Sequence, residues 1–283
     1  MLPFAKPTSS PMRLWAISDL HLAIDVNRAA LRALPARPQD WLIVAGDVCE
    51  SLALFAEAMQ FLTGRFARVL WTPGNHELWV SNGAAGPASS VAKYAALVQV
   101  ARRAGVLTPE DPYPHWSDGV VVAPVFTGFD YSFRPPDIRR EDVLAWAAEA
   151  NCVGADERLI RPAPFVRMDD WCAALCAAAE ARLAAEVPGG AATVLVSHWP
   201  LRRDLVRIPR IPRYSPWCGT VRTEDWHRRF RAAVVVSGHL HVRRTDWRDG
   251  TRFEEVSLGY AREWDHARGI AAYCRDVTPG GGG

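Results

Sequence analysis

Five short motifs place histidines beside carboxylate and amide side chains, which are residue types that bind metal ions. In chain order the motifs are Asp19-Leu20-His21, Gly46-Asp47, Gly74-Asn75-His76-Glu77, Ser197-His198 and Gly238-His239-Leu240-His241. Residues i and i+2 of an extended segment point to the same side, so Asp19 can share one centre with His21. Oxygen and imidazole ligands without a thiolate suit Mn, Fe, Co or Zn, and they are too rich in nitrogen for Ca or Mg.

The number of candidate ligands predicts two metal ions rather than one. The motifs offer seven ligands, which are too many for a single tetrahedral ion. Two ions about 3.5 to 4 Å apart can hold a hydroxide between them and lower the pKa of bound water from about 15.7 towards 7. They also stabilise the attacking and leaving oxygens of a displacement at phosphorus. The pattern therefore predicts hydrolysis of a phosphate ester.

Each motif directly follows an apolar run that is typical of a buried strand. The predicted strands are residues 14–18, 41–45, 68–72, 193–197 and 232–236. Predicted helices at 26–34 and 51–62 separate the first three strands, and this β-α-β-α-β order favours a parallel sheet. Further predictions are helices at 91–103 and 168–187, a strand at 119–125 and a hairpin that turns at Asp249-Gly250. In α/β proteins, ligands gather where parallel strands end.

The ordered motifs resemble those of the calcineurin-like metallophosphoesterase superfamily, and they span most of the chain, from Asp19 to His241. The resemblance implies an α/β fold, a four-layer αββα sandwich of two packed mixed β-sheets. It also divides the ligands between two ions: Asp19, His21 and His241 hold the first, Asn75, His198 and His239 hold the second, and Asp47 bridges both. His76 would donate a proton to the leaving oxygen. The expected ions are divalent or trivalent, Mn or Fe before Zn or Co.

The acidic residue Glu50 has two interpretations. It stands three residues after Asp47, and it resembles the acid that orients the catalytic histidine in phosphoprotein phosphatases of this superfamily. Alternatively, it interacts with the dipole of the helix that begins near Ser51. Glu77 is equally open to a structural or a catalytic role. Those phosphatases carry an arginine where this chain has Ser51, which argues against a Ser/Thr phosphatase of that type.

An arginine-rich segment lies between the last two histidine motifs. Residues 201–231 contain nine arginines and three acids, a local balance of 9 − 3 = +6. Arginine can bind phosphate through two parallel hydrogen bonds. Arg202, Arg203 and Arg213 are the candidates for binding the substrate phosphate. The alternative is that these arginines lie in solvent on an exposed loop.

Composition limits the other classes of function. The formal net charge of the 283 residues is +2, and no long basic stripe points to nucleic acid. The first residues lack the apolar core of a signal peptide. The chain contains no run of about 18 apolar residues, which a membrane span would need. The six cysteines show no paired spacing, which favours a reducing compartment. We therefore expect a cytoplasmic protein without nucleic-acid or membrane partners.

The chain is expected to form one catalytic domain with additions. We expect a disordered extension at residues 1–11, a single domain at 12–276 and a disordered glycine-rich tail at 277–283. Within the domain, residues 128–190 are expected to form an inserted, cap-like region of helices and loops. Its first part, rich in proline and arginine, has no clear period and would shape the substrate pocket.

The leading functional hypothesis is a phosphomonoesterase that acts on a small phosphorylated metabolite. The alternative is a phosphodiesterase acting on cyclic nucleotides, and a non-catalytic metal-binding scaffold is a further possibility. Scaffolds of this superfamily lose ligands or the catalytic histidine. This chain has all seven ligand types as well as His76, which favours an enzyme.

Overall fold

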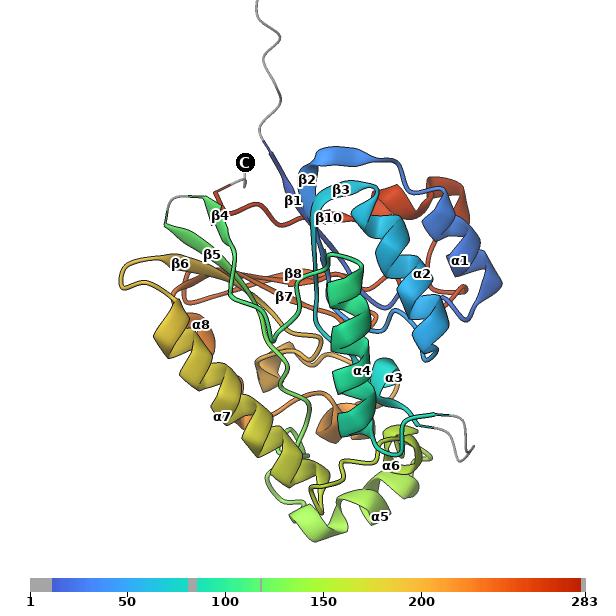
Figure 1. Cartoon of the computed structure of the whole chain (residues 1–283). Helices are drawn as coiled ribbons and strands as arrows, with labels where there is room; N and C mark the ends of the chain where they lie inside the picture. Colours follow the sequence, from blue (N-terminus) through green and yellow to red (C-terminus); the bar gives the residue numbers. More distant parts are fainter. Residues whose placement is uncertain (1–11, 81–85, 118, 281–283) are drawn as a thin grey trace, which may run out of the picture.

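The computed structural model of this chain describes residues 12–80, 86–117 and 119–280 (Figure 1). The expected N-terminal extension, residues 1–11, and the end of the expected tail, residues 281–283, lie outside the described residues. The rest of the expected tail differs from the prediction. Val277 is fully buried between the sheets, and its N–H donates to the Leu14 carbonyl at 2.8 Å, so this residue belongs to the core.

The described strands form two mixed sheets. The first has the order β10-β1-β2-β3, in which the last three strands are parallel and β10 is antiparallel to β1. Its strands are β1 (Leu14–Ile17), β2 (Arg37–Val44), β3 (Phe66–Trp71) and β10 (Arg275–Asp276). The second has the order β4-β5-β6-β7-β9-β8. Its strands are β4 (His115–Ser117), β5 (Val120–Pro124), β6 (Ala192–Val196), β7 (Ala232–Ser237), β8 (Thr245–Arg248) and β9 (Thr251–Glu255).

Alternation along the strands explains how the two sheets pack. In β2, Ile43 lies in the cluster between the sheets, whereas Leu42 and Val44 lie in the cluster under the helices. Val194 and Val196 of β6 meet Ile43 in the cluster between the sheets. A strand buried on both faces needs apolar residues at nearly every position, which is why these strands are continuous apolar runs.

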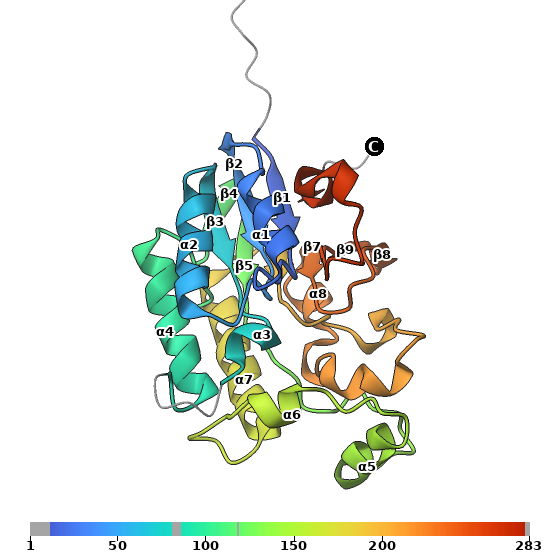
Figure 2. The same ribbon diagram turned by 90° about the vertical axis from the view of Figure 1, so that its right-hand side faces the viewer.

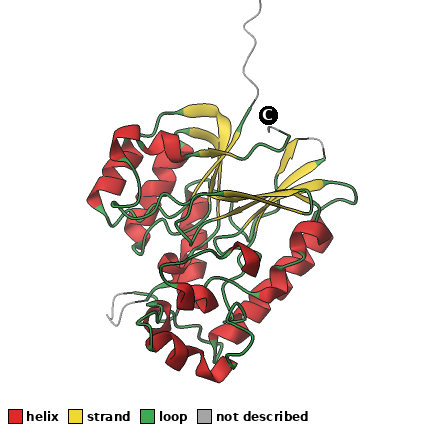
Figure 3. Ribbon diagram, turned by 180° about the vertical axis from the view of Figure 1, so that it is seen from behind, coloured by secondary structure: helices red, strands yellow, loops and turns green. Residues whose placement is uncertain are grey.

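Helices cover the outer face of each sheet and complete the expected αββα sandwich (Figures 1 and 3). The first sheet is covered by α1 (Asp25–Arg32), α2 (Leu52–Thr63) and α4 (Ser90–Arg103). The second sheet is covered by α7 (Met168–Glu186) and α8 (Trp226–Arg229). Serines define two of the helix starts: the hydroxyl of Ser51 accepts from the Leu54 N–H, and that of Ser89 accepts from the Ala92 N–H.

The expected cap of residues 128–190 is divided in the structure. Its first part contains η1 (Arg140–Asp142), α5 (Val143–Ala148) and α6 (Asp156–Leu159), which lie below the strand ends (Figure 2). Its second part, α7, belongs to the sandwich because Cys172 and Leu183 pack with Leu195 of β6. The apolar side of α7 fits the outer face of the second sheet, so only the aperiodic part extends over the strand ends.

Short elements complete the loops. These are α3 (Asn75–Leu78), η2 (Arg203–Leu205), η3 (Pro212–Trp217), η4 (Val221–Thr223), η5 (His266–Arg268) and η6 (Ile270–Tyr273). Strands β8 and β9 form the predicted hairpin, with Asp249 and Gly250 between them. Over the residues described, none of the helices combines the length and the apolar character that crossing a membrane requires.

Candidate metal centre

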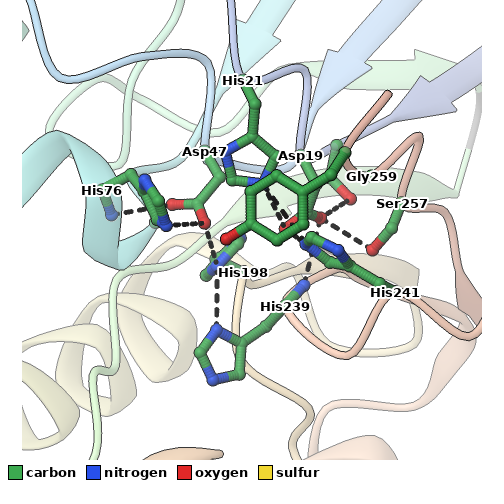
Figure 4. Close-up of polar contacts among 12 residues, drawn as sticks. Asp19, His21, Asp47, His76, His198, His239, His241, Ser257 and Gly259 are labelled. Carbon is green, nitrogen blue, oxygen red and sulfur yellow. Dashed lines mark hydrogen bonds and ion pairs between the residues drawn. The ribbon is translucent and has the colours of Figure 1, made fainter. Parts of the chain in front are cut away.

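The five motifs meet in loops at the carboxyl ends of β1, β2, β3, β6 and β7, as Figure 4 shows for most of their polar side chains. The backbone is unusual here: Asp19, His21, Asp47, His239 and His241 have φ angles of 53°, 43°, 54°, 72° and 54°. Residues with a Cβ rarely adopt positive φ, and such strain is concentrated at functional sites. The loops turn sharply so that their side chains point to a common centre.

Three side chains form the first ligand group. The Nε2 atom of His241 lies 3.0 Å from Asp19 Oδ1 and 3.3 Å from Nε2 of His21. Nε2 of His21 lies 3.9 Å from the same Asp19 oxygen. The three candidate ligand atoms lie within 4.8 Å of one another, as expected of groups that surround one cation.

The second ligand group lies beside the first. The Asn75 Oδ1 atom is 3.2 Å from His198 Nε2 and 3.1 Å from His239 Nδ1, and these two nitrogens are 3.3 Å apart. Asp47 joins this group through Oδ2, which lies 3.5 Å from His198 Nε2. Asp19, Asp47 and His198 also form a compact group of candidate ligands. Asp47 therefore lies between the two candidate ligand groups.

Outer hydrogen bonds fix which atom each ligand presents. His198 Nδ1 lies 2.8 Å from the Ala45 carbonyl, which leaves Nε2 facing the centre. His241 Nδ1 lies 2.7 Å from Glu263 Oε2, again leaving Nε2 for the centre. Such partners set the tautomer and orientation of metal-binding histidines. Among the described residues, the buried Nε2 atom of His239 has no hydrogen-bond partner, while its Nδ1 faces Asn75.

Two hydroxyl groups hold the carboxylate of Asp19, and Glu77 supports the loop that carries Asp47. Asp19 Oδ2 accepts from the hydroxyls of Ser18 at 2.6 Å and Ser257 at 2.7 Å. Buried Glu77 accepts from the backbone N–H groups of Asp47 at 2.9 Å, Val48 at 2.6 Å and Gly74 at 2.8 Å. Glu77 therefore positions the Asp47 loop, which is the structural role that the sequence allowed for it.

Glycines leave the space that the carboxylates occupy. A Cβ on Gly74 would lie 2.2 Å from Asp47 Oδ1, and one on Gly238 would lie 2.4 Å from Asp19 Oδ2. A Cβ on Gly46 would lie 2.6 Å from His198 Nδ1. No side chain fits at these positions, so the motif glycines are needed for the close approach of the ligands.

The electrostatics of the cluster fit a pair of cations. Burial raises the pKa of Asp47 well above its ordinary value, and the negative charges of Glu77 and Asp19 raise it further. Burial lowers the pKa of His198 to about 4 and that of His21 to about 3, whereas, despite burial, Asp19 and Glu263 raise the pKa of His241 to about 10. Neutral imidazoles have a lone pair for a metal, and bound cations would offset the crowded carboxylates. The oxygen and nitrogen donors therefore fit two divalent metal ions.

His76 lies at the edge of this centre with a carboxylate behind it. Its Nδ1 is 2.6 Å from Glu50 Oε1, and its Nε2 is 3.9 Å from Asp47 Oδ2. The Trp79 ring lies against the imidazole, with 3.6 Å between ring centroids. Burial acts to raise the pKa of Glu50, but the hydrogen bond from His76 helps to lower this pKa below its ordinary value. An ionised Glu50 thus orients the His76 ring so that Nε2 faces the ligands.

A pocket of about 340 Å³ opens over the ligands. Besides metal-centre residues, it is lined by Ile208, Ile211, Tyr214, Leu240, Tyr260 and Arg262, among others. The Tyr260 ring stacks on His21 with 4.5 Å between centroids. Arg262, with an 80% exposed side chain, is the arginine that lines this pocket.

The arginines expected to bind phosphate lie elsewhere. Arg202 pairs with Asp204 at 2.8 Å, and Arg213 pairs with Glu149 at 2.7 Å. Arg203 Nη1 reaches only a backbone carbonyl, at 3.5 Å. None of the three lines the pocket over the ligands. Their side chains extend from the loop towards neighbouring elements, which the loop's composition did not reveal.

Sequence reasoning missed several residues around the centre. They are Asp156, Ser257, Tyr260, Arg262 and Glu263. The last four lie just after strand β9, and a position directly after the predicted hairpin was a usable signal. Asp156 lies in the aperiodic insert, where no motif marks it.

Comparison with known proteins gives a consistent picture. The sequence model of the calcineurin-like phosphoesterase family matches residues 12–243. The acyl-carrier-protein phosphodiesterase PptH of Mycobacterium tuberculosis (strain ATCC 25618 / H37Rv) is 43% identical over 280 residues, which cover 97% of this chain and 84% of that protein. The crystal structure of the phosphopantetheinyl hydrolase PptH from Mycobacterium tuberculosis matches with a TM-score of 0.88 and 42% identity. This match covers 94% of this chain and 96% of that one.

Proposed function

The chain belongs to the calcineurin-like phosphoesterase family and is a metal-dependent phosphoester hydrolase, and from this premise we propose that its substrate is a phosphodiester. The similarity to a protein named as a phosphodiesterase carries this proposal. It favours our alternative, phosphodiester cleavage, over the expected phosphomonoesterase for small metabolites. This similarity does not support cyclic nucleotides as the substrate.

We infer that the two ligand groups hold two metal ions, with Asp47 shared between them. Bound ions would supply Lewis-acid stabilisation of the negative charge on the reacting phosphoryl group. Mn or Fe remains the expectation, because the imidazole and carboxylate donors suit these metals. The chain's own contribution is to hold the ligands in place before the ions arrive, through Glu77, Glu263 and Asp156.

His76 would act as the general acid. Hydrolysis adds water across one P–O bond and gives a phosphomonoester and an alcohol, so the leaving oxygen needs a proton. His76 Nδ1 is held by Glu50, and Nε2 can deliver that proton to the leaving oxygen. Glu50 also stabilises the protonated imidazole before transfer.

The proposed substrate is an acyl carrier protein that bears a phosphopantetheinyl group. Similarity across most of both chains to an acyl-carrier-protein phosphodiesterase supports this substrate. The serine of the carrier protein and pantetheine would be the two alcohols esterified to phosphate. Cleavage on the serine side would release phosphopantetheine and leave a free serine hydroxyl. The partner is then a protein rather than the small metabolite expected from sequence.

A reducing, cytoplasmic location is part of this proposal. The cysteines are all free in the structure, and Cys172 and Cys176 are buried among apolar side chains of the second sheet. Buried free cysteines behave as small apolar residues and require no oxidising compartment.

Mass spectrometry of the carrier protein tests the proposed function. Purified protein loaded with Mn should convert phosphopantetheinylated acyl carrier protein to the unmodified form, with release of phosphopantetheine. It should also hydrolyse bis-p-nitrophenyl phosphate faster than p-nitrophenyl phosphate. His76→Ala, loaded in the same way, is the matched control. An intact carrier protein together with a preference for the monoester would contradict the proposal.

A further inference from the structure

A second hollow, of about 610 Å³, lies beside the metal pocket and is both apolar and basic. Its lining residues are Phe133, Arg134, Pro135, Pro136, Arg203, Val206, Arg207, Ile208, Pro209, Pro212 and Ser215. Three of them are arginines, and none is an acid. We name this region the basic hollow.

The positive charges of the basic hollow are poorly neutralised by the protein itself. The Arg134 guanidinium donates to the backbone carbonyls of Ile138 at 2.8 Å and Tyr131 at 3.3 Å. The Arg203 guanidinium donates to the Arg134 carbonyl at 3.5 Å, while its backbone N–H donates to Glu224 Oε1 at 3.2 Å; Arg207 lies 3.9 Å from Asp246. Within the part of the chain that the structure describes, no ion pair involves Arg134 or Arg203. These guanidinium groups can therefore donate hydrogen bonds to a carboxylate of another molecule.

The basic hollow adjoins the metal pocket. Ile208 lines both of them. Leu240, which stands between the ligands His239 and His241, belongs to the same apolar cluster as Phe133 and Ile208. In Figure 2, the segment around residues 200–225 lies beside the insert that carries α5 and α6. A ligand with its phosphate at the metal centre can therefore extend over the basic hollow.

We propose that the basic hollow binds an acidic surface segment of the protein that carries the phosphodiester. This inference rests on the proposed function, and it identifies the part of the enzyme that recognises the protein half of the substrate. Arginine pairs well with carboxylates, and complementary charges at an interface raise the rate of encounter and favour the correct partner. The prolines and Ile208 give a preformed apolar floor for a side chain of that segment.

An acidic protein fits the basic hollow better than a nucleic acid does. Three guanidinium groups around one hollow do not form the extended stripe that a phosphate backbone follows. The apolar lining suits side chains, and it contains Phe133, which is buried and unavailable for stacking on a base.

Charge reversal tests this inference with the full-length, metal-loaded protein. In the R203E/R207E variant, kcat/KM for the phosphopantetheinylated carrier protein should fall at least tenfold relative to kcat/KM for bis-p-nitrophenyl phosphate. The loss should lie mainly in KM, and raising the salt concentration should reduce the difference from wild type. R203A/R207A, which only removes charge, should show a smaller fall of the same ratio.

The matched control reverses two exposed arginines of helices that cover the first sheet and do not line the basic hollow, Arg32 of α1 and Arg103 of α4. R32E/R103E has the same net charge as R203E/R207E and should keep the wild-type ratio. An unchanged ratio in R203E/R207E, or an equal fall in R32E/R103E, would overturn the inference while leaving the proposed substrate intact. Loss of binding to an oligonucleotide in R203E/R207E, without a change in the ratio, would likewise overturn it.

The wild-type protein separates this inference from the proposed function. If it cleaves bis-p-nitrophenyl phosphate but leaves the carrier protein intact, the proposed substrate is wrong and the inference fails with it. If it cleaves both and only R203E/R207E loses selectivity for the carrier protein, both proposals are supported.

Discussion

Asp156 of α6 accepts a hydrogen bond from the amide nitrogen of Asn75 at 3.0 Å, so the insert fixes which end of this amide faces the metal centre. The same Asp156 oxygen accepts from Trp79 Nε1 at 2.6 Å, and the Trp79 ring lies on His76. One buried carboxylate therefore supports both a candidate ligand and the candidate general acid. The loop insert is therefore a structural part of the site.

Replacing Asp156 should weaken metal binding. In Asp156→Ala the Asn75 amide can rotate. We expect metal affinity to fall about 10- to 100-fold, which is typical when a residue that holds a metal ligand is removed. Elemental analysis and titration with Mn would measure this. Asp156→Asn keeps an acceptor oxygen and should lose less, and Asp137→Ala, at an exposed acid of the same insert, is the control. Two tightly held ions in Asp156→Ala would contradict the role.

Removing the candidate general acid should slow the chemistry without emptying the site. His76→Ala loses proton donation to the leaving oxygen, and we expect kcat to fall about 10²- to 10⁴-fold. Metal content should stay at the wild-type level, because no ligand is removed. A diester with a more acidic leaving alcohol should suffer less, since it needs the proton less. An equal loss for good and poor leaving groups would argue against this assignment.

The contact between Glu50 and His76 gives a pH dependence. Because the folded-state pKa of Glu50 is lowered from 4.5, its interaction is fully present above about pH 4.5 and is lost as the pH falls through the folded value. The stability difference between wild type and Glu50→Gln should be present at about pH 5 and should shrink as the pH falls below about 4.5. Thermal unfolding across this range is the measurement. A stability difference that grows as the pH falls would contradict this prediction.

The close packing of Gly74 against the bridging carboxylate can be tested directly. In Gly74→Ala the new Cβ would lie 2.2 Å from Asp47 Oδ1, so the carboxylate or its loop has to move. We expect loss of at least one metal ion and of most activity, because Asp47 is the ligand proposed to be shared by both ions. Gly86→Ala should behave like wild type, because a Cβ at Gly86 would meet nothing within 4 Å. Full metal content in Gly74→Ala would show that a Cβ at this position does not displace the Asp47 carboxylate.

Arg262, rather than the predicted arginines, lines the pocket over the ligands. Its guanidinium can bind the phosphoryl oxygens of the substrate, so Arg262→Ala should raise KM for bis-p-nitrophenyl phosphate about tenfold and change kcat less. Arg268→Ala, an exposed arginine of η5, serves as the control. A KM equal to that of wild type would exclude this contact.

The sequence alone determined most strands and helices and the order of the ligand motifs, but it did not predict β4 or β10. Buried strands leave continuous apolar runs, and Ser51 is a hydroxyl cap placed where α2 begins. The motif residues directly follow those strands, so local patterns were enough to predict them. Chain-wide similarity, rather than local pattern, was needed to favour a phosphodiester over a monoester.

Only the tertiary structure decided which distant groups support those motifs. Asp156 is 81 residues from Asn75, and Glu263 is 22 residues from His241, in segments without a period or a motif. The predicted arginines found partners such as Asp204 and Glu149, whose positions depend on how the loop folds back. Val277, at the start of an expected tail, is buried by pairing with the first strand. Such contacts depend on the path of the whole chain, because a side chain's neighbours in space are set by the packing of remote elements.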